Sequence, residues 1–394
     1  MGCCGDVIDD TIIFSNEIFH KIKKIGEGNN GEIFLIKSNK TQKEYALKAI
    51  RTKNFDEDLL NTVKREVDIL KTLDHPNIIS FKCEFESNIK TPLINIITEY
   101  ADNGDLEEKI KNNRKEKKYF EENELLDWLS QICLGLKYMH ENRVIHRDIK
   151  PSNIFLMKNN TIKIGDFGVS KNISIFKKTR TMIGTPLYIG PELIQKKAYA
   201  FKPDIWSLGV TFCHLMSLEF PFEGRDPEDI YENILDLKKN KKILNEDKTY
   251  YKKEIIEKYS KEFLDLIDEM MSFDPQKRPS AGEILEKNIV IKRMELCLKE
   301  NNYDESKAEN AIQNYEKKQK DEKLKDNFDG EVENSDNKKS EIVNEDIKKE
   351  EKDQNENENE DKKEEDDKKE KVNYDFLRQL TYIHRSLTKD NKSE

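Results

Sequence analysis

The stretch VIHRDIKPSNIFL, residues 144–156, places a carboxylate, an ammonium group and an amide within six residues. These groups belong to Asp148, Lys150 and Asn153, and apolar runs flank them on both sides. A loop held between two apolar anchors, which we expect to be strands, can present polar side chains in a fixed geometry, and this is a common way to build a catalytic site. The plain alternative is a solvated turn.

A second carboxylate, Asp166, follows the apolar run 161–164 and begins the sequence Asp-Phe-Gly. Two carboxylates and an amide at loop positions can bind Mg²⁺ through oxygen atoms and still leave one carboxylate free to orient a hydroxyl group. The combination of Asp148, Asn153 and Asp166 therefore favours the catalytic interpretation over the turn.

A glycine-rich segment, Gly26-Glu27-Gly28-Asn29-Asn30-Gly31, is typical of a phosphate-binding loop. Glycine lets the backbone approach phosphates closely, because a Cβ atom would collide with them. Dinucleotide-binding proteins share this pattern but need a helix after the glycines, whereas a second strand-like run follows here. The dinucleotide interpretation is therefore disfavoured.

The strand-like run Tyr45-Ala46-Leu47-Lys48 supplies a cation. On strand periodicity Ala46 and Lys48 share a face, and a small residue beside a cation suits a flat ligand that carries phosphates. Glu66, in the helical run that follows, is placed to hold Lys48 in an ion pair. The alternative for Glu66 is an exposed charge, which is what most surface charges on helices are.

The elements that must position these groups change in character along the chain. Up to about residue 100, strand-like runs surround a single helical pattern, which predicts a small strand-rich lobe. From Glu122 onward, apolar residues recur at helical spacing, which predicts a larger helical lobe. The expected strands are Phe19–Ile25, Glu32–Ser38, Tyr45–Arg51, Ile78–Glu86 and Leu93–Tyr100, and the expected helices include Asp58–Leu73, Asp204–Met216, Asp226–Asn240, Ser260–Met271 and Ala281–Asn288.

The negative charge of the chain is concentrated in its C-terminal tail. The formal net charge is −10, and residues 301–370 contain 15 Lys and Arg against 26 Asp and Glu. Such a segment cannot bury enough apolar surface to offset the entropy lost on ordering, so we expect disorder. The final amphipathic patch, 374–387, is either part of a solvated spacer or a short helix that docks onto a partner or onto the lobes.

The six cysteines show no paired metal-binding spacing, and no secretory signal precedes them. Neither a disulfide framework nor a zinc site is indicated, and a reducing intracellular compartment fits best. No run approaches the roughly twenty apolar residues that a membrane span needs. Residues 325–330 lack the first acidic ligand of a calcium loop, so calcium-binding hands are not expected.

Taken together and in this order, the motifs resemble those of eukaryotic protein kinases over residues 19–290. The resemblance implies a bilobal α+β fold, with a small β-rich N-lobe, a larger mainly helical C-lobe and a disordered charged tail. It also implies binding of ATP and Mg²⁺ and transfer of the γ-phosphoryl group to protein substrates. The expected segments are 1–18 (N-terminal), 19–290 (kinase domain), 291–325 (helical extension), 326–372 (acidic tail) and 373–394 (amphipathic end).

The resemblance assigns a role to each candidate residue. Asp148 would orient the substrate hydroxyl and accept its proton, Lys150 would stabilise the transferring phosphoryl group, and Asn153 and Asp166 would hold Mg²⁺. Lys48, positioned by Glu66, would contact the α- and β-phosphates. The residues expected around the nucleotide are Ile25, Gly26, Glu27, Gly28, Gly31, Ile33, Ala46, Lys48, the hinge residue Glu99 beside Thr98, and Ala101.

Further motifs narrow the resemblance to the serine/threonine-specific branch. Lys150 after Asp148 and the run Gly184-Thr185-Pro186 are typical of that branch, and the catalytic segment resembles the NIMA-related (Nek) kinases most closely. The helix that begins at Asp204 would anchor the catalytic loop, and Arg278 would pair with Glu192. Two departures, Asn30 in the glycine-rich loop and Gly190 before Pro191-Glu192, remove no reacting group.

Regulation by phosphorylation is expected at Thr181, because Arg147 can pair with a phosphate on the segment between Asp166 and Glu192. The alternative is a segment that orders without modification. A second alternative concerns the whole chain, which would then be a catalytically weak, kinase-like scaffold that acts through its acidic tail.

The N-terminal sequence Met-Gly-Cys-Cys makes Gly2 a candidate for myristoylation and Cys3 and Cys4 candidates for palmitoylation. One acyl chain binds membranes marginally, whereas two anchor a protein. Asp6 occupies a position where Ser or Thr is favoured, so an unmodified start is the alternative. We expect a cytoplasmic protein with no nucleic-acid partner, and peripheral membrane contact through acylation is left open. By analogy with the family, association with the cytoskeleton or with cilia is also expected. The sequence does not indicate the oligomeric state.

Overall fold

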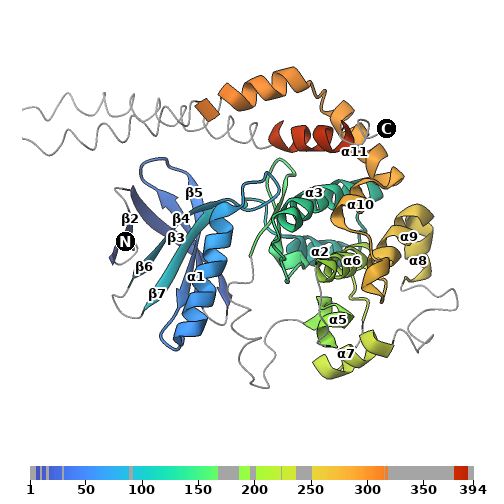
Figure 1. Ribbon diagram of the computed structural model, residues 1–394, viewed down its shortest axis with the longest axis horizontal. Helices are drawn as coiled ribbons and strands as arrows, with labels where there is room; N and C mark the ends of the chain where they lie inside the picture. Colours follow the sequence, from blue (N-terminus) through green and yellow to red (C-terminus); the bar gives the residue numbers. More distant parts are fainter. Residues whose placement is uncertain are drawn as a thin grey trace, which may run out of the picture. The chain divides into compact units, whose positions relative to one another are not determined.

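The computed structural model describes residues 6–8, 11–14, 17–28, 31–87, 92–166, 186–195, 201–222, 224–236, 251–314, 316–317 and 377–388. The chain divides into two compact units, Met1–Cys297 and Leu298–Glu394, and each is considered by itself. The first unit contains a strand-rich lobe and a helical lobe (Figure 1). This arrangement confirms the predicted bilobal α+β fold.

The N-lobe is built on a seven-stranded antiparallel sheet of order β1-β2-β3-β4-β5-β7-β6. Its strands run close to the predicted ones from the third onward. The bounds are β1 Asp6–Ile8, β2 Thr11–Phe14, β3 Glu17–Gly28, β4 Gly31–Ser38, β5 Glu44–Arg51, β6 Phe81–Ser87 and β7 Leu93–Glu99.

The register of this sheet gathers the ligand-facing candidates on one face. Ile33 lies opposite Lys48, and Ala46 lies between Leu35 on one side and Thr98 on the other. Residues directly opposite on neighbouring strands point the same way. Ile33, Ala46, Lys48 and Thr98 therefore share a face, as the alternation in the sequence predicts for Ala46 and Lys48.

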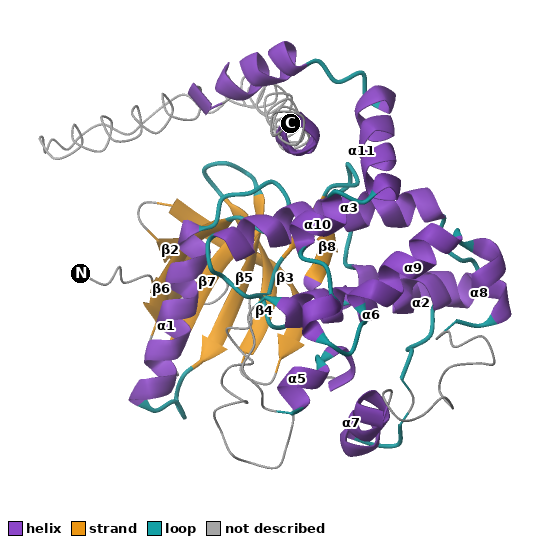
Figure 2. Cartoon of the chain, turned by 45° about the vertical axis from the view of Figure 1, so that its right-hand side comes forward, coloured by secondary structure: helices purple, strands orange, loops and turns teal. Residues whose placement is uncertain are grey.

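Helix α1 (Glu57–Thr72) packs on the same face of the sheet (Figure 2). Its N-terminus is capped by Asp56, whose carboxylate accepts a hydrogen bond of 2.9 Å from the Leu59 amide. The buried cluster beneath it comprises Ile50, Leu59, Val63, Val67, Leu70, Ile94 and Ile96. This packing fixes α1 against the strands that carry the nucleotide-facing residues.

The opposite face of the sheet is covered by side chains from both ends of the strand order. Ile12 of β2 is fully buried in a cluster with Phe19, Ile36 and Phe85. Phe14 stacks on Phe85 of β6 with ring centroids 5.5 Å apart. Residues before 19, which the sequence placed outside the kinase domain, therefore supply strands and core side chains to the N-lobe.

The C-lobe is mainly helical. Its elements are α2 Leu106–Glu116, α3 Glu122–Glu141, α5 Pro191–Ile194, α6 Lys202–Ser217, α7 Pro227–Asp236, α8 Lys253–Lys258, α9 Lys261–Met270, α10 Ala281–Leu285, α11 Asn288–Glu300 and the hairpin β8 Ile154–Leu156 with β9 Ile162–Ile164. Helices α3, α6, α9 and α10 lie close to expected helices, whereas α2 and α8 were not expected. The expected helix Asp226–Asn240 is described as far as Asp236. Helix α6 is buried along its length from Pro203 to Met216. A helix that is buried on all sides belongs in a core, and α6 is the central helix of this lobe.

The second unit brings the C-terminal segment onto the helical extension. Two further helices span residues 305–314 and 377–388. The Tyr303 hydroxyl donates to Thr381 Oγ1 over 3.1 Å, and Arg385 pairs with Glu309 at 3.0 Å. The terminal amphipathic patch thus contacts residues 303–309 of its own unit, whereas residues 326–372 lie outside the described part of the chain. Among the described residues, no helix is long and apolar enough to cross a membrane.

Candidate active site

The loop that carries Asp148 is held in place by one buried carboxylate. Asp204, at the start of α6, is fully buried and accepts the backbone N–H groups of His146 and Arg147 at 2.9 and 2.8 Å. His140 Nε2 lies 2.9 Å from the same carboxylate. The predicted anchoring by Asp204 is confirmed.

This anchoring holds an unusual backbone conformation. Arg147 has a φ of 65°, in the left-handed region that non-glycine residues seldom adopt. Such strain persists only where surrounding contacts over-determine it, and the two hydrogen bonds to Asp204 do so here. Val144 and Ile145 are not in a strand, contrary to the sequence prediction, because the backbone turns directly from the end of α3 into this loop.

Within the loop, Asn153 and Lys150 both approach Asp148. The Asn153 side-chain amide donates to the Asp148 backbone carbonyl at 2.8 Å and to its Oδ2 at 2.7 Å, and Lys150 Nζ lies 3.4 Å from Oδ2. Since the amide nitrogen faces Asp148, the amide oxygen of Asn153 is the atom left for a cation. The three residues chosen from the sequence therefore form one interacting group.

Strands β8 and β9 bring Asp166 to the same place. The Gly165 amide donates to the Asn153 carbonyl at 3.0 Å, and His146 Nε2 lies 3.1 Å from the Gly165 carbonyl oxygen. A Cβ atom on Gly165 would lie 2.8 Å from Ile79 and 2.9 Å from Phe155, so no side chain fits there. The residue that follows, Asp166, has a φ of 54°.

An ion pair joins the two lobes at the site. Lys48 of β5 donates a hydrogen bond to Asp166 Oδ1, and their side chains are 22% and 34% exposed, which leaves both accessible to a ligand. Burial pushes the pKa of Asp166 upward, but the charge and hydrogen bond of Lys48, with smaller contributions from Lys150 and His146, outweigh burial and hold that pKa below its ordinary value. Asp166 is therefore an anion that faces a cation across the lobe boundary.

The glycine-rich segment forms the ends of β3 and β4. Ile25 is 39% exposed, and the Glu27 carboxylate accepts a hydrogen bond of 2.7 Å from Lys24. A Cβ atom on Gly31 would lie 2.1 Å from the Ala49 carbonyl oxygen, whereas one on Gly26 would meet only Ile33 at 3.4 Å. Gly31 is thus required by the packing of β4 on β5, independently of any phosphate. Gly28 ends β3, and its surroundings lie outside the described part.

The hinge residues differ in what they can offer a ligand. Ala101 is buried, and the Glu99 carboxylate is also buried, 3.0 Å from Lys163 Nζ. The Glu99 amide donates to the Ser80 carbonyl at 2.9 Å, so neither the carboxylate nor the amide of Glu99 is presented to a nucleotide. The sequence analysis missed Lys163; the signal was a cation in the middle of the otherwise apolar run Thr161–Ile164.

Other candidates fall outside the described residues. Glu66 lies on α1, but its side chain is not described, so its pairing with Lys48 stays a prediction. Thr181, Gly2, Cys3 and Cys4 also lie outside the described residues.

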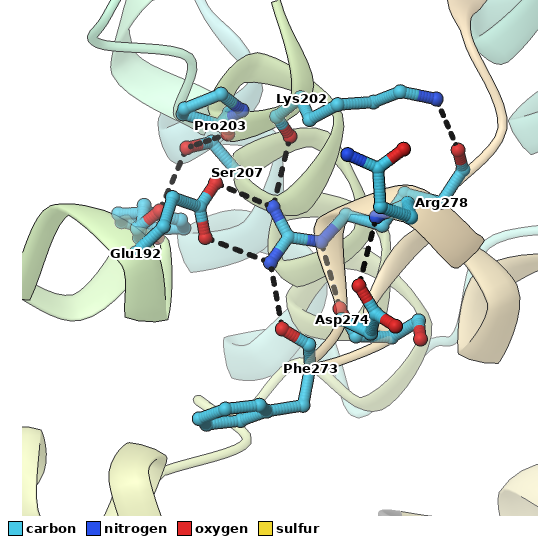
Figure 3. Close-up of polar contacts among 10 residues, drawn as sticks. Glu192, Lys202, Pro203, Ser207, Phe273, Asp274 and Arg278 are labelled. Carbon is cyan, nitrogen blue, oxygen red and sulfur yellow. Dashed lines mark hydrogen bonds and ion pairs between the residues drawn. The ribbon is translucent and has the colours of Figure 1, made fainter. Parts of the chain in front are cut away.

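The predicted pair between Arg278 and Glu192 is confirmed, and Figure 3 shows its surroundings. Two bonds of 2.6 and 2.8 Å join the guanidinium to the carboxylate, and the side chains are 0% and 3% exposed. Arg278 also lies over the Trp206 ring at 5.0 Å and donates to the carbonyl of Lys202 at 3.1 Å. The pair fastens α5, which follows the predicted regulatory segment, to the core of the C-lobe.

The comparisons with known proteins agree with this geometry. Residues 19–290 match the family model described as the protein kinase domain, which covers more than half of the chain. The chain therefore belongs to the protein kinase family.

Several similar proteins are serine/threonine-protein kinases of the Nek group. The chain is similar to the serine/threonine-protein kinase Nek1 of Mus musculus, with 34% identity over 283 residues, 72% of this chain and 22% of the relative. Nek5 of Homo sapiens is 36% identical over 68% of this chain and 35% of the relative. The probable serine/threonine-protein kinase nek3 of Dictyostelium discoideum is 36% identical over 73% of this chain and 25% of the relative. The chain thus spans about a fifth to a third of the length of these relatives.

Proposed function

We propose that the protein is a Mg·ATP-dependent serine/threonine kinase that transfers the γ-phosphoryl group of ATP to hydroxyl groups of protein substrates. The single observation that carries the proposal is the convergence of Lys48 and Asp166 from opposite lobes beside the Asp148–Asn153 group. Membership of the protein kinase family and similarity to Nek kinases support the same activity.

The residues of the catalytic loop act by position and charge. The two hydrogen bonds from Asn153 fix the Asp148 carboxylate, which then orients the substrate hydroxyl and accepts its proton. Lys150, 3.4 Å from that carboxylate, is close enough to stabilise negative charge that develops on the transferring group. Most of the catalysis therefore comes from pre-organised geometry, as expected for phosphoryl transfer.

The residues of the N-lobe hold the nucleotide. Ile33 and Ala46, on the face that carries Lys48, provide an apolar surface for the base, and the backbone at Glu99 and Ala101 provides polar contacts at its edge. Lys48 is placed to exchange its bond with Asp166 for the α- and β-phosphates. This exchange leaves the Asp166 carboxylate available to a cation.

Asn153 and Asp166 fit a magnesium ion, because a carboxylate oxygen and an amide oxygen that faces away from Asp148 are hard donors of the kind Mg²⁺ prefers. Bound Mg²⁺ supplies neutralisation of the charge on the β- and γ-phosphates. The protein's own contribution is to fix both donors through the Gly165–Asn153 hydrogen bond of 3.0 Å.

A phosphoryl-transfer assay with wild type, Asp148→Asn and Lys48→Met tests the proposal. Transfer by wild type to Ser and Thr residues, with losses of about a hundredfold or more in both variants, is expected from removal of positioned groups. The competing function, a kinase-like scaffold that acts through the acidic tail, predicts no transfer by any of the three proteins. Equal activity in all three would also refute the assigned roles.

Thr181 is proposed as the activating phosphosite, with Arg147 as the cation that pairs with its phosphate. The support is the fixed, left-handed backbone of Arg147 beside Asp148, which places an exposed cationic residue in the catalytic loop. Thr181→Ala is expected to lower the activity of the purified protein at least about tenfold. Equal activity of variant and wild type, each checked for phosphate by mass spectrometry, would dismiss the switch.

A cytoplasmic protein anchored at a membrane through Gly2, Cys3 and Cys4 is the proposed location, with cytoskeletal or ciliary association by analogy with Nek relatives. Strand β1 begins at Asp6, so the chain between an acylated Gly2 and the N-lobe sheet is short. Intact-mass measurement of the protein from its native cell tests the proposal. Masses increased by acyl groups are expected, and an unmodified N-terminus would end it.

A further inference from the structure

A buried ion pair joins the hinge to the strand that leads to Asp166. Glu99 is the last residue of β7, and Lys163 is the middle residue of β9. Lys163 Nζ lies 3.0 Å from Glu99 Oε2, and the side chains are 1% and 4% exposed. Neither side chain reaches the ligand-facing surface, so the pair lies outside the catalytic machinery described above.

The backbone around the pair is already held by hydrogen bonds from residues 77–80. The Glu99 amide donates to the Ser80 carbonyl at 2.9 Å, and the Ile79 amide donates to the Ile164 carbonyl at 2.8 Å. The Ile164 amide in turn donates to the Asn77 carbonyl at 2.8 Å. Both strand ends therefore have backbone partners, and the ion pair adds a direct connection between β7 of the N-lobe and β9 of the C-lobe.

The energetics make a purely stabilising role a poor explanation. Removing two charges from water costs several kcal/mol per ion, and the attraction inside the protein often does no more than offset this cost. In other proteins, two apolar side chains of similar volume often stabilise the fold equally well or better. What a charged pair adds is a short, strong contact between its two ends, because a charge-assisted hydrogen bond is shorter and stronger than a neutral one.

We propose that the Glu99–Lys163 pair is a positioning element that sets the hinge backbone relative to Asp166, which follows Lys163 by three residues. The pair fixes the spacing between the base end and the phosphate end of the nucleotide site, and it thereby determines affinity for Mg·ATP. This inference rests on the proposed ATP-dependent function. Neither Glu99 nor Lys163 is a catalytic residue, because neither side chain touches the reacting atoms.

The variants must separate positioning from folding. Lys163→Met alone leaves the buried Glu99 carboxylate without a cation beside it, although the Ser80 amide still donates to that carboxylate at 3.4 Å. Glu99→Gln alone leaves the buried Lys163 ammonium group without its carboxylate, and each single variant is expected to destabilise the protein. The double variant Glu99→Gln/Lys163→Met removes both charges at nearly constant volume, so the fold is retained while the defined ionic geometry is lost. The exchanged variant Glu99→Lys/Lys163→Glu restores the ion pair with reversed polarity.

A matched control uses a more exposed ion pair of the N-lobe. Lys71 Nζ lies 2.6 Å from Glu84 Oε1, with side chains 37% and 33% exposed. The double variant Glu84→Gln/Lys71→Met carries the same two chemical changes on the surface. It is expected to leave nucleotide affinity, turnover and melting temperature near the wild-type values.

The measurements are melting temperature, the Kd of a non-hydrolysable ATP analogue with Mg²⁺, and KM for ATP together with kcat. The double variant Glu99→Gln/Lys163→Met is expected to melt within a few degrees of wild type, with Kd and KM for ATP raised about fivefold or more and kcat changed less than about twofold. The exchanged variant is expected to recover at least half of the lost affinity on a logarithmic scale.

Unchanged Kd and KM in a folded double variant would overturn the inference, as would equal losses in the exchanged variant and in the double variant. The proposed function fails separately, by absence of phosphoryl transfer in the wild type. Analogue binding needs no turnover, so it still tests the positioning role in that case. A wild type that binds no analogue would overturn both.

Discussion

Replacement of Arg278 by Met is expected to destabilise the first unit strongly. The substitution removes both hydrogen bonds to Glu192 and leaves that carboxylate, 3% exposed, without its guanidinium partner. It also removes the donor to the Ser272 carbonyl at 2.7 Å and the cation over Trp206. An uncompensated buried charge costs about 3–5 kcal/mol. The total stability of such a unit is about 5–15 kcal/mol, so the expected loss is a large share.

The assay is urea unfolding followed by tryptophan fluorescence, with the free energy of unfolding extrapolated to water. A matched control is Arg225→Met, because the Arg225 side chain is 96% exposed and its contact with Asp229 is 4.0 Å long. This control is expected to change the free energy of unfolding by less than about 0.5 kcal/mol.

A double variant separates the buried charge from the lost packing. Glu192→Gln/Arg278→Met leaves no ion in the core, so it is expected to be more stable than Arg278→Met alone by about 1–2 kcal/mol. An Arg278→Met protein within about 0.5 kcal/mol of wild type would refute the reasoning. A double variant less stable than the single one would refute it as well.

The burial of Asp268, His214 and Ile12 determines how the stability of the fold responds to pH and to substitution. Burial, with the like charge of Asp265, raises the pKa of Asp268 to about 6 from an ordinary 3.8, so the stability of the fold falls as the pH rises through this range. Asp268→Asn is expected to raise the melting temperature at pH 8 and not at pH 4, and no gain at pH 8 would contradict this prediction. Burial lowers the pKa of His214 to about 4 from 6.5, so the neutral ring contributes stability above pH 6.5, and this contribution is lost as the pH falls toward 4. His214→Gln is expected to make the melting temperature fall less between pH 7 and 5. An unchanged slope would exclude His214 as the cause of that fall. Ile12→Ala is expected to lower the free energy of unfolding in urea by about 2–4 kcal/mol, because Ile12 is fully buried. The control Ile13→Ala, at a side chain that is 39% exposed, is expected to lower it by less than about 1 kcal/mol. Equal losses would show that β2 is not part of the N-lobe core.

The fold and the catalytic residues could be predicted because their signals are local and chemical. Alternation over Tyr45–Lys48 and helical spacing after Glu122 depend only on which face of an element is buried. Asp148, Asn153 and Asp166 stand out because polar groups of these types between apolar runs have few structural uses. The pairing of Arg278 with Glu192 came from the family resemblance, and the structure confirms it.

Other features depend on contacts between distant segments, which a single sequence does not reveal. Lys163 pairs with Glu99 across the lobe boundary, and nothing in either strand alone shows that both charges are buried. Ile12 and Phe14 belong to the N-lobe core because the sheet brings β2 to β6, a long-range contact. Val144 and Ile145 have the β-branched character of a strand, but the hydrogen bonds of the following residues to Asp204 override that propensity.

Lys48, Asn153 and Asp166 are proposed to converge on one Mg·nucleotide. Calorimetric titration of a non-hydrolysable ATP analogue, with and without Mg²⁺, measures this convergence when wild type is compared with Asp166→Asn. Mg²⁺ is expected to tighten binding to wild type by about tenfold or more, and Asp166→Asn is expected to lose most of this gain while it stays folded. Binding that is independent of Mg²⁺ in the wild type, or an equal gain in both proteins, would show that Asp166 does not hold the cation.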